Sequence, residues 1–143
     1  MSLRLGIVSL VAGLVWCAAA FASSSQYNGP AASGNGAGVE FGLQRARGKP
    51  RTVRRFEFHN IPAQCKGYGG SAVTGQLTIT MRVSSHRKFA GTESLNGGRE
   101  TVKVSGTFAR GFGKASGTLR VRGTVPGCTS ADTGVVHWRA PRV

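Results

Sequence analysis

Apolar and polar side chains alternate with a period of two along several short segments of this chain. The clearest run puts apolar side chains on one phase, Leu77, Ile79, Met81 and Val83, and polar ones between them. Successive side chains of a strand point to opposite faces, so this pattern predicts strands with one buried face. The same alternation occurs in 39–43, 56–58, 102–108, 119–125 and 136–138. No window shows a convincing helical period with capping residues.

Turn-forming residues separate these runs, at 67–70, 96–98, 111–113 and 126–127. A length of 143 residues allows one domain. Short antiparallel strands with frequent turns predict an all-β fold, either an antiparallel β-sandwich or a jelly-roll-like barrel.

The first 22 residues have the layout of a secretory signal peptide. A positive start at Arg4 precedes the apolar stretch 5–20, and Ala20-Phe21-Ala22 is a small-residue cleavage site. The alternative is an uncleaved membrane anchor, because the apolar run is nearly long enough to span a bilayer. The cleavage site favours removal after Ala22. We therefore expect a secreted or extracytoplasmic protein of the cell envelope, without a transmembrane segment.

The segment 23–38 is rich in Ser, Gly, Asn and Ala and shows almost no apolar periodicity. Such a composition predicts a flexible linker. The single β domain is then expected to cover 39–143.

Three cysteines are present, and Cys17 would leave with the signal peptide. In an oxidising compartment the remaining two, Cys65 and Cys128, predict one disulfide. Few large apolar residues follow the signal peptide, so the core alone is small for so charged a chain. Closing a loop of this length stabilises a domain by about 4 kcal/mol in the chain-entropy model.

The net charge is +14, from 19 Lys and Arg against 5 Asp and Glu. The densest positive segment contains no acid and consists of Arg45, Arg47, Lys49, Arg51, Arg54 and Arg55. Its first four cations alternate strictly, so in an extended conformation they would project from one face. Arginine binds carboxylate and phosphate groups through two parallel hydrogen bonds. The segment therefore predicts a polyanion-binding site.

For an exported protein the expected partner is an anionic polymer or acidic glycan of the cell envelope. The alternative is a basic face that serves solubility only. Nucleic acid is not expected as a dedicated target, because the chain after residue 22 has only two Tyr and one Trp and lacks a recognisable aromatic platform or recognition helix.

No catalytic residue, cofactor or metal site is predicted. The three histidines, His59, His86 and His137, lack the spacing of a zinc site. The carboxylates that could serve a hydrolase are Glu40, Glu57, Glu93, Glu100 and Asp132, and nothing in the sequence marks two of them as a pair. No serine lies in a Gly-x-Ser-x-Gly elbow. We therefore expect a non-enzymatic protein, with a small carbohydrate-active hydrolase or a structural, protein-interaction module as the alternatives.

Trp138 is the aromatic residue of most interest, and two roles are open for it. On the buried phase of its strand it would pack in the core beside the disulfide. On the exposed phase it could stack against a sugar together with Tyr68.

A set of motifs extends over about 38–143 and consists of Gly38-Val39-Glu40-Phe41, Phe56-Glu57-Phe58, Ile61-Pro62, Gly117-Thr118-Leu119-Arg120, the Cys65 and Cys128 spacing and the terminal Trp138-Arg139-Ala140-Pro141-Arg142. Through these motifs the sequence resembles an uncharacterised family of short, exported bacterial β-rich proteins. The resemblance implies a single disulfide-bonded β domain outside the cytoplasm and supplies no activity or site residues.

Overall fold

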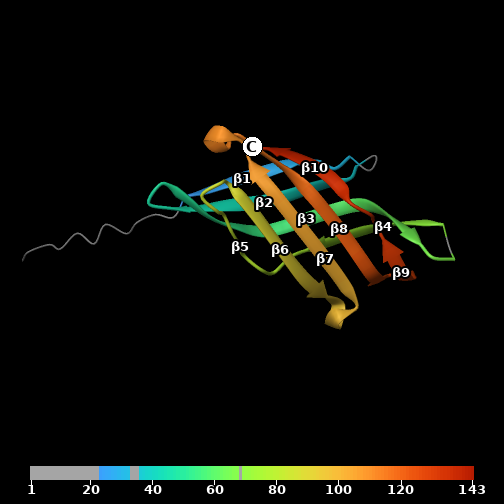
Figure 1. Ribbon diagram of the computed structural model, residues 1–143. Coiled ribbons are helices and arrows are strands. Elements are labelled where there is room, and N and C mark those ends of the chain that lie inside the picture. Colours follow the sequence, from blue (N-terminus) through green and yellow to red (C-terminus); the bar gives the residue numbers. More distant parts are fainter. Residues whose placement is uncertain (1–22, 33–35, 68) are drawn as a thin grey trace, which may run out of the picture.

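The computed structural model describes residues 23–32, 36–67 and 69–143, which form an antiparallel β structure (Figure 1). The strands are β1 (Ser24–Pro30), β2 (Gly38–Ala46), β3 (Lys49–Cys65), β4 (Gly70–Gln76), β5 (Met81–Arg82), β6 (Lys88–Leu95), β7 (Glu100–Phe108), β8 (Lys114–Val125), β9 (Cys128–Asp132) and β10 (Val136–Pro141). Two 3-10 turns, Asn96–Gly98 and Arg110–Phe112, precede β7 and β8. The prediction of an all-β, antiparallel fold is confirmed.

All ten strands belong to one sheet, with the order β1-β2-β3-β9-β8-β7-β6, while β10 pairs with β8, and β4 and β5 pair with β3. The sheet folds over on itself, so that the layer of β6, β7, β8 and β10 lies across the layer of β1, β2 and β3 (Figure 1). The edge strands β1 and β10 meet through two isolated bridges, Tyr27 to Arg142 and Ala31 to Trp138. The described strands do not close into a barrel, and the architecture is a two-layer, sandwich-like one.

The prediction of a flexible linker over 23–38 is wrong for β1. This strand pairs with β2 from Ser24 opposite Gln44 to Pro30 opposite Gly38. Its Tyr27 is fully buried, and the Tyr27 hydroxyl donates a hydrogen bond of 2.6 Å to the carbonyl oxygen of Phe112. A polar strand with one buried side chain shows no alternation, so its place in the sheet comes from contacts with distant residues. Part of the predicted linker, Ser24–Pro30, therefore belongs to the sheet. The predicted signal peptide, 1–22, lies outside the described residues.

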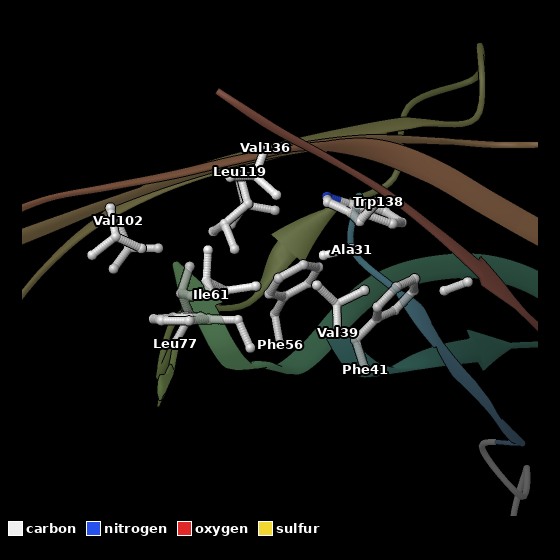
Figure 2. Packing of buried hydrophobic residues seen from close by; sticks show 14 of the residues in the cluster. Ala31, Val39, Phe41, Phe56, Ile61, Leu77, Val102, Leu119, Val136 and Trp138 are labelled. Atoms are coloured by element: carbon white, nitrogen blue, oxygen red, sulfur yellow. The ribbon is translucent and has the colours of Figure 1, made fainter. Parts of the chain in front are cut away.

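The core between the two layers contains a cluster of aromatic rings among aliphatic side chains (Figure 2). Phe41 from β2 lies at its centre, with ring-centroid distances of 5.1 Å to Tyr27, 5.4 Å to Phe56 and 5.6 Å to Trp138. Stacked and edge-to-face aromatic pairs at such distances stabilise a core beyond the burial of their area. Large rings thus compensate for the small number of apolar residues.

Strand β3 carries two irregularities that break its alternation. Arg55 has a φ of 51° and Asn60 a φ of 52°, and the pairing register shifts near each of them. An extra residue in one strand of a pair bends that strand. Val53 and Phe56 consequently both point into the core, while Arg55 and its neighbour Arg54 are both exposed.

The predicted disulfide between Cys65 and Cys128 is present, with a Cα–Cα distance of 5.8 Å. It joins the end of β3 to the start of β9. Within the described residues, no helix is long and apolar enough to cross a membrane.

Candidate functional site

The basic segment 45–55 forms the hairpin between β2 and β3. Ala46 pairs with Lys49, which leaves Arg47 and Gly48 as a two-residue turn with φ values of 52° and 73°. Two left-handed residues are what a tight type I′ hairpin turn requires. The expectation that the first four cations share one face of an extended strand does not apply, because the chain reverses direction inside the segment.

The Arg45 side chain packs at the edge of the core. It is half-buried, and its guanidinium carbon lies 5.1 Å from the centroid of the Phe112 ring. Burial raises the pKa of Tyr27, while the charges of Arg45 and Arg142 act in the opposite direction. Arg45 therefore packs against aromatic residues, as a guanidinium above a ring does.

Four further cations of the hairpin are on its surface. Arg47, Lys49, Arg54 and Arg55 are exposed, and Arg51 lies in the same strand as the last two. The solvent-exposed side of strands β2 and β3 also carries two carboxylates. Glu40 on β2 is directly opposite Glu57 on β3, and both are exposed. Like charges in this position repel each other. The face therefore has mixed charge beside a basic hairpin tip.

The remaining carboxylates have structural partners. Glu93 accepts hydrogen bonds from the backbone nitrogen and the hydroxyl of Thr78, at 2.7 Å for the nitrogen. Glu100 is 4% exposed and accepts a hydrogen bond of 2.7 Å from Asn96 Nδ2, and burial raises its pKa. Both side chains hold turns or strand ends in place.

Asp132 neutralises two arginines of β8. Its carboxylate accepts hydrogen bonds from Arg120 Nε at 3.0 Å and Nη2 at 2.7 Å, and lies 3.4 Å from Arg122 Nε. The bonds from Arg120 lower the pKa of Asp132 to about 2. The carboxylate therefore stays charged at neutral and mildly acidic pH.

The three histidines lie on β3, in the turn before β6 and on β10. His86 and His137 are exposed, and His59 is half-buried next to Gly38. Across the part of the chain that the structure describes, no three His, Cys, Asp or Glu side chains gather as a metal site would need.

Trp138 occupies the core and is 3% exposed. Its indole packs edge-on against Phe41 and Phe56 and lies over Gly106 and Gly117, where no Cβ would fit. Of its two predicted roles, the structure supports packing in the core. Tyr68, the proposed partner in sugar stacking, lies outside the described residues.

Acrylamide quenching of the Trp138 fluorescence is expected to be weak in the protein lacking residues 1–22, which leaves Trp138 as its one tryptophan. A collisional quencher cannot reach an indole enclosed by aromatic rings and strands. The Stern–Volmer slope should approach that of free tryptophan only after unfolding. A steep slope in the native protein would contradict the buried position.

The outward side chains of β6, β7, β8 and β10 form a second surface, which we call the outer face. Besides Lys114 and Arg122 of β8, its exposed cations come from three other strands and are Lys88, Lys103 and Arg139. Among the residues with described side chains, the ion pairs are Arg120–Asp132 and Arg122–Asp132, so these three cations have no such partner. The sequence analysis did not predict a site here. The signal was the outward phase of the alternation, on which Lys103 and Arg139 both fall.

Comparison with protein-family models, with curated proteins and with solved structures finds no match to this chain. The resemblance to a family of short exported proteins therefore stays a prediction.

Proposed function

We propose that the protein is an exported, non-catalytic module that binds anionic polymers of the cell envelope through exposed cations. The observation that carries this proposal is that most exposed cations of the described residues have no acidic side chain to neutralise them. Asp132 is engaged with Arg120 and Arg122, and the hairpin cations Arg47, Lys49 and Arg54 have no acidic partner among the described side chains. An excess of unpaired positive charge on a stable scaffold attracts polyanions.

The disulfide is compatible with this location, because such bonds persist in oxidising compartments. The backbone bonds between β2 and the segment before it start directly after residue 22, where the Ser23 carbonyl oxygen accepts a hydrogen bond from the Arg45 nitrogen. Removal of a leader after Ala22 would therefore leave β1 and its pairing with β2 intact.

Retention on immobilised polygalacturonate at increasing salt tests the proposal. We expect binding at low ionic strength that weakens as salt is added, since exposed charges are screened over about 8 Å at 0.15 M. Neutral dextran should retain nothing. The control is an unrelated basic protein of equal net charge, which should elute at lower salt. Equal elution of the two proteins would reduce the binding to generic ion exchange and refute the proposal.

A further inference from the structure

Three shallow depressions lie next to one another on the outer face. Their volumes are about 580, 550 and 440 Å³. The first and second share Thr118, the second and third share Ala90 and Ser105, and the first and third share Ser116. They therefore form one continuous groove that crosses β6, β7, β8 and β10.

The floor of the groove is one row of side chains across four strands. Ala90 is opposite Ser105, Ser105 opposite Thr118 and Thr118 opposite His137. At about 4.8 Å between strands, the row extends over roughly 14 Å. The Ser105 and Thr118 hydroxyls are 2.9 Å apart and share one hydrogen bond. Each hydroxyl oxygen has further capacity, so the centre of the floor can bind a ligand's hydroxyl groups.

Cations border the groove on both sides. The neighbouring row on one side runs Lys88, Thr107, Ser116 and Arg139, with a cation on each outermost strand. The row on the other side carries Lys103, opposite Arg120. Arg120 is occupied by Asp132, which leaves Lys88, Lys103 and Arg139 of these rows available to a ligand, and the exposed Arg82 also lines the third depression. A negatively charged chain in the groove would meet positive charge along both edges.

We propose that this groove binds a linear acidic polysaccharide. Its carboxylates would contact Lys88, Lys103 and Arg139, and its hydroxyls would bond to Ser105 and Thr118. A sugar chain suits the site better than single-stranded nucleic acid, because His137 is the one aromatic side chain in the described groove rows, whereas successive bases need a series of stacking side chains. The inference rests on the proposed function and assigns its short-range contacts to the groove, with the hairpin cations contributing long-range attraction.

Two triple variants of equal net charge separate these roles. The groove variant is Lys88→Gln, Lys103→Gln and Arg139→Gln, and the hairpin variant is Arg47→Gln, Lys49→Gln and Arg54→Gln. All six positions are exposed, so both variants should melt like the unaltered protein. Binding kinetics are measured with oligogalacturonate of defined length by surface plasmon resonance.

We expect the groove variant to bind about tenfold or more weakly, mainly through faster dissociation. The hairpin variant should lose association rate and salt dependence with little change in dissociation, as remote charges do. An equal loss of affinity in the two variants, or a larger increase of the dissociation rate in the hairpin variant, would overturn the inference. Absence of binding by the unaltered protein would instead remove the proposed function itself.

An uncharged obstruction provides an independent test. Ser105→Phe places a ring on the groove floor without altering the net charge, and Thr101→Phe places one on the same strand outside the three depressions. We expect Ser105→Phe to abolish oligogalacturonate binding and Thr101→Phe to leave it unchanged. Normal binding by Ser105→Phe would contradict the groove.

The class of ligand is tested with polyphosphate and with vesicles of phosphatidylglycerol. Oligogalacturonate should bind more tightly than either at equal ionic strength and should alone be sensitive to Ser105→Phe. Tighter, groove-dependent binding of polyphosphate or vesicles would overturn the assignment to a polysaccharide.

Discussion

Replacing both Cys65 and Cys128 by alanine is expected to lower the free energy of unfolding by about 4 kcal/mol, through the added freedom of the unfolded chain. The two residues are 63 positions apart. For a domain of this size such a loss corresponds to a fall of roughly 15 °C in melting temperature. Thermal unfolding followed by circular dichroism measures the change.

The Cys65–Cys128 disulfide lies where strand β9 connects the two layers, so its removal should weaken the contact between β3 and β9 most. The ladder of β9 with β3 consists of Gln64 with Asp132 and Cys65 with Ala131, followed by one backbone bond from the Lys66 nitrogen to the Ser130 oxygen. So short a ladder holds the layers together weakly without the covalent link. Reductant should lower the melting temperature of the native protein and leave that of the double alanine variant unchanged. Equal melting temperatures with and without the disulfide would refute its stabilising role.

Trp138→Ala is expected to reduce the free energy of unfolding by about 3–5 kcal/mol, the usual cost of removing a large aromatic side chain from a core. The indole contacts Phe41 and Phe56 from the opposite layer, with centroid distances of 5.6 and 5.7 Å (Figure 2). Its removal would leave a cavity between the layers that rigid strands cannot fill. Denaturant unfolding followed by circular dichroism measures the loss.

Two further variants make the interpretation of Trp138→Ala specific. The buried indole Nε1 of Trp138 has no hydrogen-bond partner among the described residues, so Trp138→Phe removes an unsatisfied donor while keeping an aromatic ring in the core. It should cost much less than the alanine variant. His137→Ala, at the exposed neighbouring position, should change stability by no more than about 0.5 kcal/mol. Similar losses in all three variants would contradict the assignment of Trp138 to the core.

The predictable parts of the fold are those that depend on local sequence. The outward and inward phases of β7 and β8 follow from their alternation, because neighbouring side chains of a strand point to opposite faces. The pairing of Cys65 with Cys128 followed from cysteine number and the expected compartment. The exposed cations of the hairpin also lie within one short segment, where their density was visible.

Other features escaped prediction because distant residues decide them. Tyr27 of β1 is buried through contacts with Phe41, Phe108 and Phe112, which come from other parts of the chain. Arg55 interrupts the alternation of β3, since the register with β2 shifts there. Arg45 does not lie with the exposed cations of segment 45–55, because its side chain packs against the ring of Phe112, a residue far from it in the sequence.

The sequence by itself determined the all-β class, the single disulfide and the surplus of positive charge. Only the tertiary structure decided where on the surface those positive charges lie. Lys88, Lys103 and Arg139 belong to three strands, and the antiparallel register sets them around one groove. Alternation fixes the face of a strand on which a side chain lies, whereas strand order and register fix its neighbours, and these depend on contacts between residues far apart in the chain.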